Sequence, residues 1–351
     1  MKTLTEKAIA LLTDLIAIQS FSGEEDTTAA RIEQWFTDHD IPFQRQNNNV
    51  YAFNKAFDPN KPTMLLNSHH DTVHPNSAYT KDPFHPHVDD GKLFGLGSND
   101  AGGALVSLIA LFTHFYAHPN PCYNLILAAT AEEESSGPNG LNSLLPHLPP
   151  LAVAIVGEPT LMQLAIAEKG LVVFDGTVKG KASHAAHPNA ENPIVKLPKV
   201  IDWLSNFTFE KHSSVLGPVK LTVTQVNAGT QHNVVPADVA LVIDVRVNDC
   251  YSNQEVVDLL QENAPLELVP RSTDLNSSSI PVDHPLVQAG LALGRETYGS
   301  PTLSDQAKLS CPSLKLGPGD STRSHTANEY IYIHEIEEGI DLYIQLLDKI
   351  L

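Results

Sequence analysis

The sequence predicts an α/β protein in which a mixed sheet flanked by helices is interrupted by a smaller α+β domain. Apolar runs of strand length alternate with helical patterns over residues 1–169. Between residues 170 and 279 the order of elements changes to β-α-β-β-α-β, and strand and helix patterns return over 280–351. We therefore expect a first domain built from 1–169 and 280–351, and an inserted domain from 170–279.

The composition is that of an ordinary globular protein. The chain has 351 residues, 42% hydrophobic and 18% charged, which is enough for two domains with sizeable cores. Its 22 Lys and Arg against 41 Asp and Glu give a net charge of -19, which argues against nucleic acid or an anionic membrane as partner. The three cysteines form no disulfide framework. A charged N-terminus without a signal-peptide pattern and the absence of membrane-length apolar runs favour the cytoplasm.

The elements of the first domain follow from apolar spacing. In chain order we expect helices at 2–18 and 24–36, strands at 50–53 and 63–67, a long loop at 75–97, a helix at 105–116 and strands at 124–129 and 151–156. After the insertion we expect a helix at 284–298, a strand near 309–316 and a closing helix at 334–351. The strands are continuous apolar runs, as is typical of strands buried on both faces.

The inserted domain shows a complete layer pattern of its own. We expect strands at 171–178, 219–226, 239–247 and 266–269 and helices at 192–207 and 252–263. This order matches a ferredoxin-like α+β unit.

The first candidate site lies where the strand at 63–67 ends in His69-His70-Asp71. In an extended strand His69 and Asp71 point to the same side, and His70 to the other. A carboxylate that accepts the proton from one ring nitrogen fixes the tautomer of a histidine that binds a metal through the other. A surface turn rich in His and Asp is the alternative.

Asp100 follows a glycine-rich stretch and precedes the helix at 105–116. The stretch lacks the spacing of a dinucleotide or phosphate-binding loop, so we do not expect nucleotide binding. An aspartate in front of a helix is commonly an N-cap, and a carboxylate there can also bridge two metals.

Two further strands end in carboxylates. Glu132-Glu133-Glu134 follows the strand at 124–129, and Glu158 follows the strand at 151–156. Adjacent carboxylates at the end of a buried strand are costly unless a cation or proton offsets their charge, whereas a solvated loop would make them harmless. Because this edge of an open α/β sheet is where ligands bind, we expect the three strand ends to form one site.

Taken in order, five motifs resemble those of the M20 metallopeptidase family, and more narrowly its acetylornithine deacetylase and succinyl-diaminopimelate desuccinylase branch. They are His69-x-Asp71, Asp100-x-Gly-Gly, Thr130-Ala-Glu-Glu-Glu134, Gly157-Glu158-Pro159 and Gly317-Pro-Gly…His325. The resemblance covers nearly the whole chain. It implies a zinc-peptidase-like catalytic domain and an inserted dimerisation, or lid, domain.

The resemblance also implies two zinc ions per chain, with cobalt or manganese as substitutes. The implied ligands are His69 and Glu158 for one ion, Glu134 and His325 for the other, and Asp100 as the bridge. Asp71 would then orient His69, and Glu133 would be the general base. Zinc accepts both imidazole and carboxylate ligands, so the residue types suit this task.

In the inserted domain, His184 matches the family histidine that reaches across a homodimer and stabilises the oxyanion. The alternative is a surface histidine. Asn233 and Arg246 resemble substrate-binding positions, and a guanidinium suits a substrate carboxylate. An ordinary ion pair between Asp244 and Arg246 is the competing interpretation.

Some positions depart from the family pattern or stay open. No lysine follows the bridging aspartate, where Ala101 stands, and His70 competes with the preceding histidine as a ligand. Relatives carry a cis peptide after the aspartate, so we expect one at Asp100–Ala101. Lys169 and Arg323 lie beside motifs and either contact the substrate or are solvated charges.

The function that the resemblance implies is hydrolysis of an N-acyl amino acid by a metal-activated water with a glutamate as base. N-acetylornithine or an N-acyl-citrulline of arginine biosynthesis is the expected substrate, with acetyl and succinyl both open. A di- or tripeptidase is the alternative within the family. A non-catalytic binding protein on the same scaffold is a third hypothesis, which the intact set of ligands disfavours.

Overall fold

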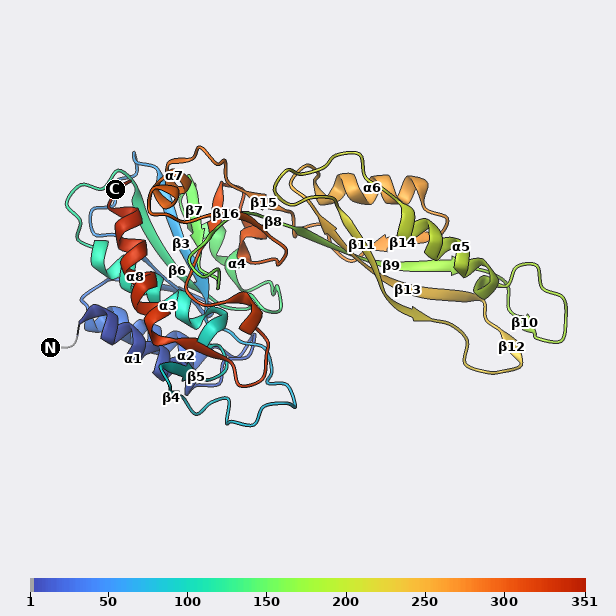
Figure 1. Cartoon of the computed structure of the whole chain (residues 1–351), viewed down its shortest axis with the longest axis horizontal. Coiled ribbons are helices and arrows are strands. Elements are labelled where there is room, and N and C mark those ends of the chain that lie inside the picture. The colour runs from blue at the N-terminus through green and yellow to red at the C-terminus, as the bar shows by residue number, and fades with distance from the viewer. Residues whose placement is uncertain (1–2) are drawn as a thin grey trace. The chain divides into compact units, whose positions relative to one another are not determined.

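The computed structural model describes residues 3–351, and its contacts divide the chain into two compact units. The first unit holds the chain up to Ile166 together with Ser279–Tyr298 and Ser304–Leu351. The second holds Ala167–Ser278 and Gly299–Leu303. Figure 1 shows both units, each with its own sheet and helices.

A nine-stranded mixed sheet forms the centre of the first unit. Its order is β1-β2-β6-β3-β7-β17-β8-β15, and β16 also pairs with β8. The strands are β1 (Gln44–Gln46), β2 (Asn49–Phe53), β3 (Thr63–His69), β6 (Asn124–Thr130), β7 (Val153–Val156), β8 (Leu164–Glu168), β15 (Ser278–Ser279), β16 (Thr297–Ser300) and β17 (Ser313–Lys315). Strand β3 runs parallel to β6 and β7, whereas β2 is antiparallel to β6. All residues of β3, β6 and β7 are buried, in accord with their continuous apolar sequence.

Helices cover this sheet. They are α1 (Leu4–Ile16), α2 (Asp26–Asp38), α3 (Gly103–Phe115), α4 (Leu141–Leu144), α7 (Pro285–Ala292) and α8 (Ile333–Leu347). Thr3 and Glu6 form a capping box that starts α1. Helix α3 is almost wholly buried because it packs against β3 and β6 and also against α1 and α8 (Figure 1). None of the helices between residues 3 and 351 is both long and apolar enough to cross a bilayer.

The second unit is a four-stranded antiparallel sheet with two helices. Its main elements are β9 (Gly170–Lys179), α5 (Pro193–Asn206), β11 (Lys220–Asn227), β13 (Asp238–Val247), α6 (Asn253–Asn263) and β14 (Glu267–Pro270), in sheet order β11-β13-β9-β14. A small ladder of β10 (Ser183–His184) and β12 (Val234–Val235) lies apart from this sheet. The predicted β-α-β-β-α-β order is therefore present, and alternate residues of β9 such as Val172, Phe174 and Val178 enter its core.

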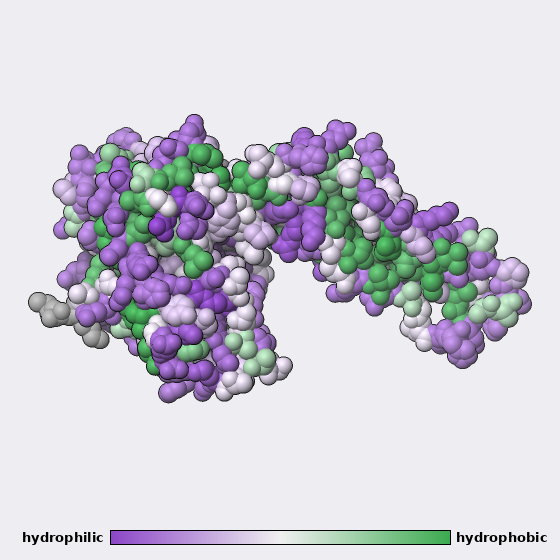
Figure 2. Space-filling model, in the orientation of Figure 1, coloured by the Kyte–Doolittle hydropathy of each residue, from purple (hydrophilic) through white to green (hydrophobic). Residues whose placement is uncertain are grey.

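Hydrophobic residues also reach the surface of the second unit. Figure 2 shows a band of them along the face on which α5 and β9 lie. The exposed large apolar side chains include Val195 of α5, at 74% exposure, and Val226 of β11, at 46%. The prediction that this domain forms a homodimer stays a prediction.

One predicted helix is wrong in its second half. The helix expected over 284–298 ends at Ala292, and residues from Thr297 onward form the strand β16. Gly294 lies between them with φ +76, a left-handed conformation that ends a helix at little cost when the residue is glycine. The predicted first helix, 2–18, begins at a residue outside the described range, and α1 covers its central part.

The loop expected over 75–97 contains a hairpin. Strands β4 (His87–Asp89) and β5 (Lys92–Phe94) pair through a turn at Asp90 and Gly91, both with positive φ. Strand β18 (Tyr330–Tyr332) then adds to β5. An Asp-Gly pair favours the two-residue turn of a β-hairpin, so the sequence did indicate this hairpin although its strands are only three residues long.

Candidate metal centre

Parallel pairing brings three strand ends to one edge of the sheet. His69, the last residue of β3, pairs in register with Thr130, the last residue of β6. On the other side Asn67 pairs with Val156, the last residue of β7, and accepts a hydrogen bond from the N–H of residue 157. The acidic segments that follow β6 and β7 therefore leave the sheet next to His69.

The imidazole of His69 is buried, with only 1% of the side chain exposed. Its Nδ1 lies 3.0 Å from the backbone oxygen and 3.3 Å from Oδ1 of Asp71. Its Nε2 has no hydrogen-bond partner among residues 3–351 and faces Oδ1 of Asp100 at 3.4 Å, Oε1 of Glu158 at 3.8 Å and Oε2 of Glu133 at 4.0 Å. A cation bound at this point would give the buried nitrogen a partner and would also balance the charge of the carboxylates, so the arrangement suits a metal ion.

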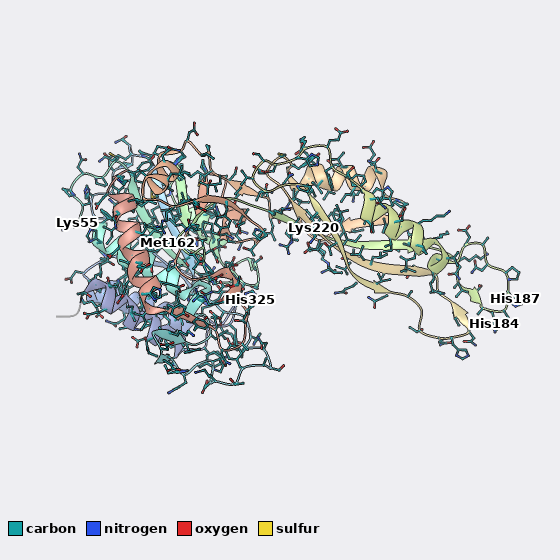
Figure 3. The ribbon with its side chains drawn as sticks, in the orientation of Figure 1. Lys55, Met162, His184, His187, Lys220 and His325 are labelled. Atoms are coloured by element: carbon teal, nitrogen blue, oxygen red, sulfur yellow. The ribbon has the colours of Figure 1, made fainter. Side chains whose placement is uncertain are left out.

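A second cluster forms on the other side of Asp100. Its Oδ2 lies 3.6 Å from Nε2 of His325, which is itself 3.0 Å from Oε2 of Glu134 (Figure 3 labels this histidine). The two oxygens of Asp100 thus face one histidine each. In the described part of the chain, two sets of side chains have ligand atoms close enough to share an ion, namely His69, Asp100 and Glu134, and His69, Glu133 and Glu158.

The crowding of charge shifts the pKa of these groups. Burial, together with the charge of neighbouring carboxylates, raises the pKa of Glu133 well above its usual range and that of Glu158 to about 8. The hydrogen bond with Glu134 raises the pKa of His325 to about 9. Burial lowers the pKa of His69, but its carboxylate neighbours outweigh burial and hold it well above 6.5. A bound cation would offset this excess of negative charge.

Asp71 has more contacts than its predicted contact with His69. Its carboxylate accepts the backbone N–H groups of Glu133 and Glu134 at 3.0 and 3.1 Å, and the hydroxyl of Ser22 at 2.6 Å. Burial raises its pKa, but hydrogen bonds from His69, Ser22 and the N–H of Glu133 dominate and lower it to about 2. An ionised Asp71 therefore fixes the loop that carries both glutamates.

His70 is already engaged by other groups. Its Nδ1 lies 2.9 Å from the hydroxyl of Thr28, and its Nε2 lies 3.0 Å from the backbone oxygen of Asn48. Burial lowers its pKa to about 4. Both ring nitrogens of His70 therefore already have partners, so His70 has no nitrogen left to bind a metal in place of His69.

Asp100 does not cap α3. It lies within a short π-helical turn (Ser98–Gly102), and its own φ and ψ of -117° and 99° are not helical. The peptide bond between Asp100 and Ala101 is cis, as expected.

Four predicted site residues belong to the second unit. His184 and His187 are exposed near β10, with their ring centroids 5.7 Å apart (Figure 3). The backbone oxygen of Asn233 accepts the N–H of residue 185. Arg246 binds both carboxylate oxygens of Asp244, at 2.9 and 3.1 Å. Lys169 donates to the backbone oxygen of residue 218 at 3.0 Å, and burial lowers its pKa.

Arg323, a predicted site residue of the first unit, binds a glutamate that is not one of the predicted metal ligands. Its guanidinium binds Glu335 at 2.6 Å, and both side chains are nearly buried. It also lies over the rings of Tyr330 and Tyr332. This arrangement accounts for the charge of Arg323 without a substrate.

Sequence reasoning missed two buried carboxylates beside the centre. Asp305 accepts the hydroxyl of Thr130 at 2.9 Å and forms an ion pair with Lys308 at 3.2 Å. Glu329 accepts backbone N–H groups from the segment around Asp100, and burial raises its pKa to about 8. Neither residue belongs to one of the five motifs, although Glu329 follows His325 by only four residues.

The comparisons with known proteins agree with this geometry. The model of peptidase family M20/M25/M40 matches residues 65–349. A succinyl-diaminopimelate desuccinylase of Cereibacter sphaeroides is 25% identical over 372 residues, covering 97% of each chain. It is one of several desuccinylases among the similar curated proteins.

Two solved structures show the same fold. The aminopeptidase PepT of Bacillus cereus has a TM-score of 0.77 at 16% identity, covering 99% of this chain and 98% of its own. The YXEP protein of Bacillus subtilis, described as a dinuclear metal binding peptidase from the M20 family, has a TM-score of 0.73 at 16% identity, covering 98% and 97%. With more than half of its length matched by the family model, the chain belongs to peptidase family M20/M25/M40 and is a hydrolase of that family.

Proposed function

We propose that this hydrolase removes an acetyl or succinyl group from an N-acyl-L-amino acid with the help of two zinc ions. The observation that carries the proposal is the position of Asp100, whose two carboxylate oxygens face His69 and His325 separately. A single carboxylate between two histidines, each with further carboxylates beside it, is the arrangement that a pair of ions requires.

In this proposal Asp100 is shared by both ions. The remaining ligands are His69 and Glu158 for one ion and Glu134 and His325 for the other. When bound, the ions would acidify a water and polarise the amide carbonyl of the substrate.

Glu133 would act as the general base and then as the acid. Its side chain is 13% exposed and reaches within 4.0 Å of His69. Burial and nearby carboxylates raise the pKa of Glu133 in the metal-free chain. Two bound cations would favour its ionised form, which can take a proton from water and return it to the leaving amine. Geometry alone also allows Glu133 to be a ligand beside Glu158, so metal content has to separate the two roles.

The second unit would supply substrate contacts. We propose that Arg246 receives the substrate carboxylate after exchanging part of its interaction with Asp244, and that Asn233 and Lys169 are further substrate contacts. His184 would stabilise the oxyanion in a homodimer, and its exposure is compatible with contact to a second copy. Arg323 is the weakest of the proposed substrate contacts because Glu335 already binds it.

The identity of the substrate rests on the relatives. Their names favour a succinyl group and diaminopimelate, whereas the motifs also fit N-acetylornithine and an N-acyl-citrulline of arginine biosynthesis. A di- or tripeptidase is the alternative, and the likeness to PepT supports only the fold. The two activities differ in whether the substrate has an acyl group or a free α-amine next to the scissile bond.

The test combines metal analysis with a substrate panel. The metal-free chain is loaded with zinc, and elemental analysis is expected to give two ions per chain. Hydrolysis is then assayed with N-acetyl and N-succinyl forms of ornithine, citrulline and diaminopimelate, alongside dipeptides and tripeptides. Turnover of the acylated amino acids alone supports the proposal, and faster turnover of the peptides would replace it with the peptidase. Less than one ion per chain would support a non-catalytic protein.

A further inference from the structure

The backbone that delivers Asp100 is held by one buried side chain. The carboxylate of Glu329, which is 2% exposed, accepts the N–H groups of Asn99 at 2.8 Å and Asp100 at 2.9 Å through Oε1. Its Oε2 accepts the N–H of Gly97 at 3.2 Å. All three hydrogen bonds come from the segment that carries Asp100.

This segment needs an external acceptor. Asp100 has non-helical φ and ψ, and Gly97 has φ +74, so the N–H groups here are not paired as in a regular helix. A buried N–H without an acceptor costs about 1–3 kcal/mol. Glu329 provides two oxygens for three such groups, and its backbone oxygen also accepts the N–H of Gly95 at 3.0 Å.

The same short stretch of chain also carries His325, four residues before Glu329. One end of the stretch therefore presents an imidazole to Oδ2 of Asp100 at 3.6 Å, while the other end binds the backbone of Asp100. The intervening Asn328 has a different task, because its side-chain oxygen accepts the N–H groups of Thr80 and Lys81, both at 3.0 Å.

We propose that Glu329 is a positioning residue that sets the carboxylate of Asp100 between His69 and His325, and so sets the affinity for the pair of ions. This inference rests on the proposed function, because it assumes that Asp100 bridges two ions. Glu329 itself touches neither ion nor substrate. Residues of this kind, one contact behind the ligands, typically change metal affinity or activity by about 10–100-fold when altered.

The test is the variant Glu329→Gln, which has nearly the same shape but turns one of the two acceptors into a donor that faces a backbone N–H. Zinc is titrated into the metal-free protein by calorimetry, and cobalt loading is followed by visible absorption. We expect zinc affinity to fall at least about tenfold and the cobalt bands to shift. With metal in excess, we expect kcat to fall more than KM changes, since the substrate contacts are untouched.

Two further variants separate positioning from general damage. Glu329→Asp keeps the negative charge but has a shorter side chain, so we expect the same loss of zinc affinity. This variant replaces Glu329→Gln in the test if Glu329→Gln folds poorly. Asn328→Gly removes the side-chain hydrogen bonds of the neighbouring position without touching Asp100, and glycine tolerates the φ of +54 found there. Its zinc affinity should stay within about twofold of wild type.

The outcomes distinguish the two proposals. Fewer than two zinc ions in the wild-type chain would contradict the proposed function itself. If the wild type binds two ions and the zinc affinity is unchanged in Glu329→Gln and Glu329→Asp, only the proposed role of Glu329 is overturned. An equal loss of affinity in Asn328→Gly would also overturn it, because the effect would then belong to the whole loop.

Discussion

Adjacent glutamates in this chain have different surroundings. Glu133 reaches toward His69, with 4.0 Å between Oε2 and Nε2, whereas Glu134 lies 3.0 Å from His325. They diverge because Asp71 holds both of their N–H groups, one on each carboxylate oxygen, so the two side chains leave a fixed loop in different directions. Glu132, directly before them, turns away and accepts the N–H and side-chain amide of Asn139.

This difference predicts the result of Glu133→Gln. The substitution keeps the shape but removes the proton acceptor, so kcat should fall about 10²–10⁴-fold while two zinc ions remain bound. Steady-state kinetics and elemental analysis of the same preparation check this. Glu132→Gln is the matched control and should keep near wild-type kcat. Loss of one zinc ion in Glu133→Gln would instead make Glu133 a ligand.

At the scale of elements, close packing between strand ends keeps Glu158 in place. Gly317 follows β17 and packs so tightly on the turn after β7 that an added Cβ would lie 2.5 Å from the backbone oxygen of Glu158 and 2.8 Å from Cβ of Ala104. The N–H of Gly317 also donates to the hydroxyl of Thr160 at 3.2 Å. The turn that presents Glu158 is therefore held by a contact that only glycine permits.

Gly317→Ala should consequently disturb both stability and the metal centre. We expect a loss of about 1–3 kcal/mol in the free energy of unfolding, typical of overpacking, together with weaker zinc binding. Urea unfolding and zinc titration measure the two effects. Gly217→Ala is a useful control, because Gly217 has φ +69 but open space around it, so only stability should fall. Unchanged zinc affinity in Gly317→Ala would show that the turn tolerates the shift.

The elements also show what the sequence could and could not predict. Strands such as β3 and β6 were predictable because burial on both faces leaves a continuous apolar run. The predicted helix over 284–298 failed because it was extended past Gly294, a residue type that commonly ends helices and at which the backbone here turns. Glu329 could not be assigned, because its partners lie about 230 residues away and are backbone N–H groups, which leave no trace in side-chain patterns.

At the scale of the whole molecule, the centre concentrates in one place part of the acidic residues that give the chain its net charge of -19. Without an ion, several acidic groups hold protons that they would release in the unfolded chain. Zinc bound only by the folded state would stabilise it by about 2.7 kcal/mol when free zinc is 100 times its dissociation constant. Metal-free and zinc-loaded protein should therefore differ in their response to pH as well as in stability.

Between pH 6.5 and 8 the metal-free protein should become less stable as pH rises. The pKa of Glu158 is raised from 4.5 to about 8 and that of His325 from 6.5 to about 9, so in this range the folded state binds more protons than the unfolded state. The low pKa of Asp71, about 2, changes stability only at lower pH. His70, whose pKa is lowered from 6.5 to about 4, makes stability rise with pH mostly below pH 6.5 and so opposes the trend only at the lower end of this range.

Zinc should oppose this trend, because its ligands must be deprotonated and binding therefore strengthens as pH rises. Urea unfolding at the two ends of the range, with chelator and with excess zinc, should show a gap between the two forms that widens toward high pH. A metal-free protein that gains stability across this range would contradict the protonation of the carboxylate cluster. An equal gap at both ends would mean that zinc binding displaces no protons from these side chains.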